Sequence, residues 1–435
     1  MLGNQKNIAI ILSHKQQLKL FFPIMLLANS DSRINLFCID ITKVKGEETK
    51  KRFNSLESIE YIKLPSLCAI TDFLDKKKID TILIEYIGLL ELKNKKEKLK
   101  IVYLQHSHDV ISSFSNNIEI EQLKKIDKFL LYSDYWKAEF IDAIRKNHLI
   151  CDESIDQITK NLISVGFPEL DQIKDFKKNE ILKKFKLPNN KRGIIFFDPI
   201  GHVNHVGNAY YGYFFKLWGS ALNKVKILLR QILYDLKYNL TKLPRIIFMI
   251  FKISLSGKGR TTYEDIFLKL RKYCDDNDFL LIVKSRPKNN DPFFVRSHSD
   301  FYSHDISYHP FTLLELLYIS DYYIGFNSTA TLEAVACGCG VTQLDVCPAE
   351  FQYFNYGGGI YTYLAKQLHT NNSWLNYHDL VKVISHKDIK DHALNNLEFE
   401  GYKKNTTYIQ KFLHKLDYKS SNRALSELID HDKKK

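Results

Sequence analysis

Residues 321–345, DYYIGFNSTATLEAVACGCGVTQLD, decide the fold class that this sequence predicts. The apolar run 322–324 has the pattern of a buried strand, and three small polar residues follow it: Asn327, Ser328 and Thr329. The helix-forming stretch LEAVA comes next, and glycines separate it from a second apolar strand, VTQL. A strand, a helix and another strand in this order indicate a parallel sheet that helices cover on both faces.

The same alternation occurs along much of the chain. Apolar runs of strand type include NIAIIL, INLFCID, DTILIEYI, LKIVYLQHS, GIIFFD and FLLIVKS, and helical patterns such as TYEDIFLKLRKYCDD lie between such runs. The predicted fold class is α/β, with two Rossmann-like domains that face a cleft. We expect an N-terminal domain at 1–168, a linker at 169–190, a C-terminal domain at 191–400, and a C-terminal helix and basic tail at 401–435.

Composition limits the classes of protein that this chain can belong to. Its 435 residues, 45% of them hydrophobic, are enough for two domains with full cores, and the net charge of +13 favours an anionic partner. The seven cysteines have no metal-site spacing, and their odd number favours a reducing compartment. The first apolar run is too short for a secretory signal, and no run is long enough to cross a membrane. We expect a cytoplasmic protein.

One segment, 202–260, departs from the alternation. It lies where such a fold usually has a short loop, and it contains ten Lys or Arg against one acid, Asp235. Its net charge of +9 accounts for most of the charge of the chain. Apolar residues fall on one helical stripe, at Leu222, Val225, Leu229, Ile232, Leu236 and Leu240, and the apolar run LPRIIFMIFKISL follows. The pattern predicts a helical amphipathic insertion in the second domain.

Two interpretations of this insertion are open. It can be an amphipathic hairpin that packs on the domain and leaves its basic face solvated, or it can bind an anionic membrane surface. Basic charge, aromatic residues and an apolar excess occur together here, which favours peripheral binding to the membrane. A nucleic-acid partner is not expected, because no recognised binding motif accompanies the basic residues.

The polar residues after strand 322–324 have two possible roles. Asn327, Ser328 and Thr329 can cap the following helix, and the same groups at a helix N-terminus can hold phosphate. Glu333, one helical turn beyond Thr329, can accept a hydrogen bond from a ribose hydroxyl, or it can simply be an acid favoured in a first turn. We expect this segment to cap its helix and bind phosphate at once.

Basic and acidic residues end two other strands of the second domain. Lys284 and Arg286, in LIVKSRP, follow a parallel strand and can grip phosphate oxygens at the cleft. Asp198 closes the strand in FFDPIG and can contact a donor or an acceptor. The alternative for the two basic residues is solvated charge at the end of a strand.

The order of these motifs resembles a known superfamily. SVGFPELD at the domain junction, IIFFDPIG at the start of the second domain, VKSRP and the stretch 321–345 follow one another. This arrangement resembles the GT-B superfamily, in particular transferases like the CDP-glycerol glycerophosphotransferases that build surface polysaccharides. UDP-N-acetylglucosamine 2-epimerases are similar in layout. Arg286-Pro287 stands where the glycerophosphotransferase pattern has His-Pro, and Ser328-Thr329 where it has Ser-Ser, so the nucleotide base and the transferred group stay open.

Histidines follow two strands of the first domain. YLQHSHDV places His106 and His108 just after the carboxyl end of a strand, and the resemblance implies a catalytic or substrate-binding histidine in this region. An inverting transfer needs a base that titrates near neutral pH, which suits imidazole. His14, after the first strand, is a second candidate, and each of these can instead be a loop or capping residue. No Asp-x-Asp pair follows a strand as a metal-dependent transferase requires, so we expect no catalytic metal and no cofactor.

The sequence therefore predicts a metal-independent GT-B transferase on the inner face of the cell membrane. We expect the N-terminal domain to bind the acceptor and the C-terminal domain a CDP-, CMP- or UDP-linked donor. The acceptor is expected to be a surface polysaccharide, lipid-linked in our interpretation. The alternatives are an enzyme like the UDP-N-acetylglucosamine 2-epimerases and a membrane-associated scaffold without catalytic activity.

Overall fold

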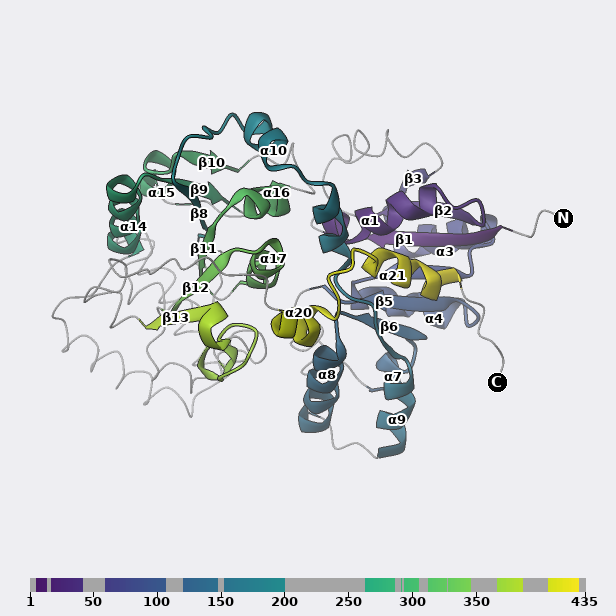
Figure 1. Cartoon of the computed structure of the whole chain (residues 1–435). Coiled ribbons are helices and arrows are strands. Elements are labelled where there is room, and N and C mark those ends of the chain that lie inside the picture. The colour runs from purple at the N-terminus through teal and green to yellow at the C-terminus, as the bar shows by residue number, and fades with distance from the viewer. Residues whose placement is uncertain are drawn as a thin grey trace, which may run out of the picture. The chain divides into compact units, whose positions relative to one another are not determined.

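The computed structural model describes most of the chain outside the segment 200–262 (Figure 1). The described residues are 5–13, 17–41, 59–106, 120–147, 152–199, 263–285, 291, 293–304, 312–326, 328–345, 366–385 and 406–429. The chain divides into two compact units. The first comprises Met1–Phe176, Tyr308–Thr312 and Asn405–Lys435, and the second comprises Lys177–Ser307 and Leu313–Lys404. The predicted amphipathic insertion, 202–260, lies outside the described residues.

The described part of the first unit contains a seven-stranded sheet in the order β3-β2-β1-β4-β5-β6-β7, with every adjacent pair parallel. Its strands are β1 (Lys6–Leu12), β2 (Ile34–Asp40), β3 (Glu60–Lys63), β4 (Thr81–Ile84), β5 (Lys100–Leu104), β6 (Lys128–Leu131) and β7 (Leu162–Ser164). Its helices are α1 (Gln17–Asn29), α3 (Leu67–Lys76), η1 (Ile87–Leu90), α4 (Glu91–Lys95), α7 (Ile120–Leu123), α8 (Asp134–Asn147), α9 (Asp152–Lys160), η2 (Pro168–Asp175), α20 (Thr406–Leu413) and α21 (Ser420–Ile429).

The described part of the second unit contains a six-stranded parallel sheet in the order β10-β9-β8-β11-β12-β13. Its strands are β8 (Gly193–Phe197), β9 (Phe279–Lys284), β10 (Phe301–Ser303), β11 (Tyr322–Gly325), β12 (Gly340–Asp345) and β13 (Val381–Ser385). Its helices are α10 (Lys178–Lys184), α14 (Tyr263–Asn277), α15 (Phe293–Ser297), α16 (Thr312–Ile319), α17 (Ala330–Cys337) and η6 (His378–Leu380).

Both sheets change the direction of strand addition at one point. In the first unit the order reverses between β1 and β4, and in the second it reverses between β8 and β11. In open parallel sheets, ligands bind outside the carboxyl ends of the strands at such a reversal. The fold thus marks one position in each unit where functional side chains are expected.

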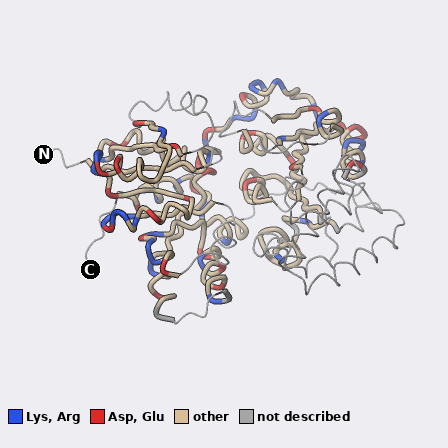
Figure 2. Tube along the Cα trace, turned by 180° about the vertical axis from the view of Figure 1, so that it is seen from behind, with Lys and Arg blue, Asp and Glu red and all other residues tan. Residues whose placement is uncertain are grey.

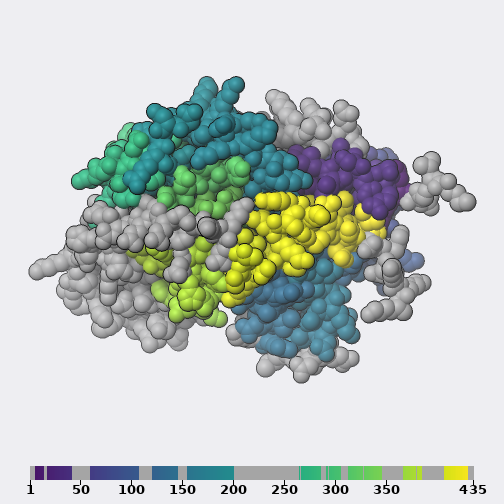
Figure 3. Space-filling view, viewed as in Figure 1, coloured from purple at the N-terminus to yellow at the C-terminus, as the bar shows by residue number. Residues whose placement is uncertain are grey.

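Near-continuous apolar strands form the cores of both units, as a parallel sheet covered on both faces requires. Residues from β1, α1 and α21 share the core of the first unit, so its C-terminal helix packs beside its N-terminal helix. Figure 3 shows this proximity of the yellow C-terminal residues to the purple N-terminal ones. Figure 2 shows that Lys, Arg, Asp and Glu are spread over the described parts of the chain with long uncharged stretches between them.

Aspartates at the edge of each sheet where the strands begin, here called the amino edge, connect neighbouring strands by hydrogen bonds. Each lies one residue before a strand, and its Oδ2 accepts the backbone N–H of an adjacent strand. The pairs, with their N···O distances, are Asp127 with Ile101 (2.7 Å), Asp300 with Leu281 (2.7 Å) and Asp321 with Ile194 (2.8 Å). These carboxylates satisfy backbone donors at positions where the ladder of the sheet begins.

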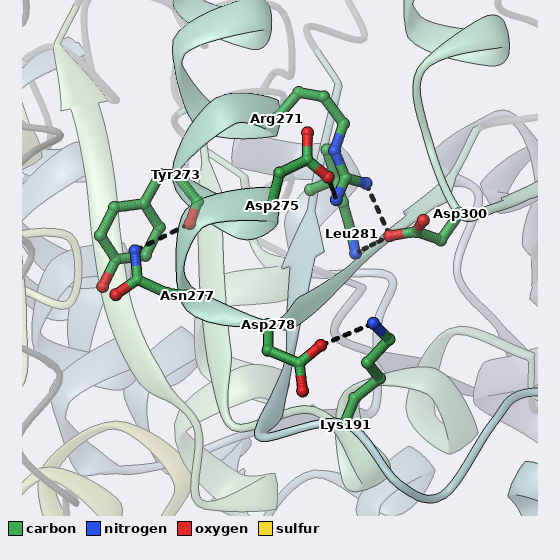
Figure 4. Close-up of polar contacts among 8 residues, drawn as sticks. All are labelled: Lys191, Arg271, Tyr273, Asp275, Asn277, Asp278, Leu281 and Asp300. Carbon is green, nitrogen blue, oxygen red and sulfur yellow. Dashed lines mark hydrogen bonds and ion pairs between the residues drawn. The ribbon is translucent and has the colours of Figure 1, made fainter.

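Figure 4 shows this kind of contact around the start of β9. The guanidinium of Arg271 lies 2.6 Å from Asp300 and 2.6 Å from Asp275, and Lys191 lies 2.6 Å from Asp278. Asp278 follows α14 with φ 58°, in the left-handed region that a chain reversal uses. Asp275 and Asp278 thus form ion pairs at the amino edge of the sheet, opposite the edge where ligands bind in such folds.

Candidate functional site

A polar cluster lies at the carboxyl edge of the first sheet, where the strand order reverses. Glu85 is the first residue after β4, and His106 is the second residue after β5, the neighbouring strand. Nδ1 of His106 lies 3.3 Å from Oε1 of Glu85. Gln17, at the start of α1, donates from Nε2 to Oε2 of the same carboxylate. Three segments far apart in sequence therefore meet at Glu85.

Gln17 is itself held in place by the end of β1. Its Oε1 accepts the N–H of Ser13 at 2.6 Å, and its Nε2 donates to the Ser13 hydroxyl at 2.8 Å. The side chain of Gln17 is 1% exposed, so its amide has left bulk water and needs these partners. The strand β1 thus fixes the group that binds Glu85.

The end of β5 is also fixed. Gln105 is fully buried, its N–H donates to the carbonyl of Leu130 at 2.9 Å, and its Oε1 accepts the N–H of Tyr132 at 2.8 Å. These bonds bind the residue before His106 to the end of β6. The side chain of His106 keeps 19% of its surface exposed, so it is anchored at the backbone and still reached by solvent.

Of the three predicted catalytic histidines, the structure describes His106. It places this ring against Glu85, a contact that the sequence did not predict. His14 and His108 lie outside the described residues. Tyr86, beside Glu85, is one of three large apolar or aromatic residues that are exposed in the described parts of the chain, at 48%.

The corresponding edge of the second sheet carries Asp198. This residue follows β8, is 7% exposed and accepts a hydrogen bond from the hydroxyl of Tyr323 on β11 at 2.9 Å. Gly325 makes room for that hydroxyl, because a Cβ at this position would lie 2.3 Å from the Tyr323 oxygen. The strand reversal of the second unit thus holds a nearly buried carboxylate bound by a tyrosine.

The stretch that predicts the fold forms β11, α17 and β12. Ser328 is 5% exposed and its Oγ accepts the N–H of Ala330 at 3.3 Å, whereas Thr329 makes no capping bond with its side chain. Thr329 is the N-cap residue of α17, so the predicted capping bond is missing there, and Ser328, one residue earlier, binds the N–H of the first helical residue instead. Glu333 is 2% exposed in the first turn of α17, and Asn327 lies outside the described residues.

Lys284 ends β9, as the sequence predicts, and its ammonium donates to the carbonyl of Ser285 at 3.2 Å. Ser303 pairs with it in register at the end of β10, and the Ser303 hydroxyl is buried. Burial raises the pKa of the nearby Tyr302 phenol, which donates a hydrogen bond to Asp291 at 3.0 Å. Arg286 lies outside the described residues. These contacts place one of the two predicted phosphate-binding cations at the carboxyl edge.

Three of the described cysteines, Cys38, Cys274 and Cys339, are buried as packing residues, whereas Cys68 is exposed. Burial raises the pKa of the Cys274 thiol to about 12 and also raises the pKa of Cys339, whose Sγ lies 3.2 Å from the carbonyl oxygen of Leu317. A thiol with such a raised pKa is a poor nucleophile and a poor metal ligand at neutral pH. Within the described ranges, no three His, Cys, Asp or Glu side chains are grouped so as to hold a metal ion.

None of the described helices is long and apolar enough to cross a membrane.

No family model and no curated protein sequence matches this chain. Solved structures do match it. UDP-GlcNAc 2-epimerase from Neisseria meningitidis, bound to UDP-GlcNAc, is 10% identical with a TM-score of 0.54, and the match covers 98% of this chain and 100% of that chain. The S. aureus MnaA–UDP complex is 11% identical with a TM-score of 0.52, covering 97% of this chain and 96% of that one.

The wall teichoic acid polymerase TagF, in a structure soaked with CDPG, is 14% identical with a TM-score of 0.51, and the match covers 98% of this chain and 90% of that chain. At these identities the likeness concerns the fold. The predicted fold class, α/β with two Rossmann-like units, is confirmed.

Proposed function

We propose that this chain is a GT-B transferase that moves a sugar or a polyol phosphate from a nucleotide-activated donor to a surface-polysaccharide acceptor. The observation that carries the proposal is the position of the polar clusters. In both units, nearly buried acids and their partners lie at the carboxyl edge where the strand order reverses, which is the ligand site of such sheets. The fold is one that nucleotide-binding proteins use, since the solved structures above hold UDP, UDP-GlcNAc and CDPG.

In this proposal, the second unit binds the donor. Lys284, together with Arg286, neutralises the phosphate oxygens, and the N-terminal turn of α17 with Ser328 adds backbone donors and a positive dipole end. Glu333 accepts a hydrogen bond from a ribose hydroxyl of the donor. The cations and the helix dipole stabilise the leaving phosphate, which is how such a site can work without a metal.

In the same proposal, the first unit supplies the base. An acceptor hydroxyl loses its proton to His106, and the acceptor oxygen forms a bond to the carbon or phosphorus of the transferred group. The bond from that atom to the nucleotide phosphate breaks, and the phosphate oxygen takes the electron pair. Proton transfer of this kind contributes about 10²–10⁴-fold to a rate.

A thermal-shift screen with CDP-glycerol, CMP-, UDP- and GDP-linked sugars tests the donor part. We expect one nucleotide class to raise the Tm, and we expect Lys284→Ala to weaken its binding by about 10-fold or more, since a charge-assisted contact contributes about 1.5–3 kcal/mol. Lys178→Ala, at an exposed lysine of α10 in the same unit, is the matched control. Stabilisation by none of these ligands would contradict the proposal and favour a scaffold.

A nucleotide-sugar 2-epimerase is the second candidate, and the observation that favours it is the fold of the Neisseria structure. The two candidates differ in their need for an acceptor. An epimerase converts UDP-N-acetylglucosamine without any acceptor. A transferase releases nucleotide rapidly only when a hydroxyl acceptor is present. Acceptor-free conversion of the sugar would therefore replace the transferase proposal.

The membrane part of the proposal rests on the sequence of 202–260. We place the protein on the inner face of the cell membrane, with a lipid-linked acceptor, because ten basic residues and an apolar stripe occur together there. Replacing 206–258 by a short Gly-Ser linker should abolish sedimentation with vesicles that contain phosphatidylglycerol and keep the nucleotide-induced rise in Tm. Unchanged sedimentation of the shortened protein would remove the membrane from the proposal.

A further inference from the structure

The contact between His106 and Glu85 favours one of the two ring nitrogens as the carrier of the proton. Nδ1 lies 3.3 Å from Oε1 of the carboxylate, and an ionised carboxylate can only accept hydrogen bonds. Nδ1 must therefore carry hydrogen for the contact to be favourable. In the neutral ring this leaves Nε2 with the lone pair, which is the atom a proton acceptor needs.

The carboxylate of Glu85 is not free to turn away from the ring. Its second oxygen, Oε2, accepts the Nε2–H of Gln17, and the amide of Gln17 is bound on both its atoms to Ser13. The Glu85 side chain is 11% exposed. Because β4 lies between β1 and β5 in the sheet, the chain of contacts runs across three adjacent strand ends.

The side of the cluster that carries His106 is equally constrained. Gln105 binds the backbone of β6 through both its N–H and its side-chain oxygen, so the segment that carries the ring cannot shift without breaking buried hydrogen bonds. A proton acceptor held by buried partners on a rigid sheet needs little reorganisation before it acts.

We infer that Glu85 is a positioning residue that holds His106 in the Nδ1–H form with Nε2 as the proton acceptor, and that Gln17 fixes Glu85 for this task. The inference deepens the proposed function and rests on it for one point, that the proton comes from a hydroxyl of the acceptor. The orientation of the ring can be measured without any substrate.

Long-range ¹⁵N–¹H NMR of the full chain, at a pH where His106 is neutral, measures this state directly. His106→Gln assigns the ring signals by their loss. In the parent we expect Nδ1 to give the signal of a protonated nitrogen and Nε2 that of an unprotonated one. In Glu85→Ala we expect the two signals to exchange, since an imidazole without a partner at Nδ1 favours the Nε2–H form.

Two variants separate positioning from a general effect on the fold. Glu91→Ala removes an exposed acid at the start of α4 and should leave the His106 signals as in the parent. Gln17→Met keeps the volume of Gln17 and removes both its donor and its acceptor, so it should give a mixture of the two ring forms. The signals of His298, on the other unit, should stay constant in every variant.

An Nε2–H ring in the parent, or an Nδ1–H ring that persists in Glu85→Ala, would overturn the role of Glu85, and a parent-like spectrum of Gln17→Met would overturn the role of Gln17. If the spectra are as expected and His106→Gln still transfers at the parent rate, the positioning contacts stand and the proposed base is wrong.

Discussion

The acids at the two edges of the sheets have different kinds of partner. At the amino edges, Asp127, Asp300 and Asp321 each accept the backbone N–H of an adjacent strand. At the carboxyl edges, Glu85 and Asp198 accept hydrogen bonds from side chains, an amide and an imidazole in one case and a phenol in the other. The carboxylates of Asp127, Asp300 and Asp321 therefore bind a strand N–H at the amino edge, where Asp127 and Asp300 also pair with Lys93 and Arg271, whereas those of Glu85 and Asp198 bind uncharged or imidazole side chains at the carboxyl edge.

This difference suggests that the carboxylates at the amino edges stabilise the fold and that those at the carboxyl edges take part in function. A carboxylate bound to a strand N–H cannot leave without exposing a backbone donor, so its partner is set by the fold. A carboxylate bound to a histidine or a tyrosine has a side-chain partner, which the ladder of the sheet does not require. The amino edges should hence affect stability most when altered, and the carboxyl edges should affect binding and turnover.

The largest expected loss of stability comes from the amino edge of the second sheet. Asp300→Ala removes the acceptor of the Leu281 N–H and one of the two acids that bind the guanidinium of Arg271. Because that guanidinium is 14% exposed, the free energy of unfolding should fall by about 3 kcal/mol. Guanidinium chloride denaturation measures this change.

Asp275→Ala is the matched control for that variant. It removes the other acid bound to Arg271, but Asp275 is 63% exposed and its bond is an i, i+4 pair on α14. Such a pair contributes about 0.3–0.5 kcal/mol. Equal losses in the two variants would show that the Arg271 pairs matter and the strand N–H does not.

A smaller loss is expected at the carboxyl edge of the same sheet. Tyr323→Phe removes the hydroxyl that donates to Asp198, leaving this nearly buried carboxylate short of a partner at a cost of about 1.5 kcal/mol. Titration with the nucleotide found in the screen should show a changed affinity in this variant and parent affinity in Asp300→Ala. An unchanged affinity in Tyr323→Phe together with a changed affinity in Asp300→Ala would show that the two edges do not differ in this way.

The smallest effect concerns Lys191 and its dependence on pH. The hydrogen bond from Lys191 lowers the pKa of Asp278 below 3.8, so the folded state favours the carboxylate more than the unfolded state does. This stabilisation is present above pH 3.8 and is lost as the pH falls through the lower pKa of the folded state. Calorimetry should thus show a small Tm decrease for Lys191→Ala at neutral pH that disappears in acid, and a pH-independent decrease would contradict the pairing.

Periodicity predicts the fold class, α/β with parallel sheets. The stretch 321–345 contains a strand, a helix and a strand, and the structure forms β11, α17 and β12 there. The reason is that parallel strands buried on both faces must be continuously apolar, which leaves a strong local signal. The sequence also predicts Lys284 and Asp198 at strand ends, and the structure has Lys284 as the last residue of β9 and Asp198 directly after β8, because the last apolar residues mark the boundary.

The partners within the first unit could not be predicted in this way. The pattern DTILIEYI favours a strand that includes Glu85, but β4 ends at Ile84, so the acid lies at the sheet edge and not within the strand. Gln17 lies 68 positions from Glu85, and their contact requires that β1 and β4 be neighbours. Strand order depends on how the whole sheet packs, and periodicity does not contain it. An acid directly after an apolar run is the one local signal that could have pointed to Glu85.

Hydrogen exchange with and without the stabilising nucleotide shows whether ligands bind at the carboxyl edges. We expect peptides that cover Gly193–Phe197 with Asp198, and Ala330–Cys337 in α17, to gain protection when the nucleotide is bound. The peptide covering Tyr263–Asn277, which ends at the amino edge, should exchange as it does in the free protein. Protection gained at that peptide, with none at the carboxyl edge, would show that the nucleotide does not bind at the carboxyl edges.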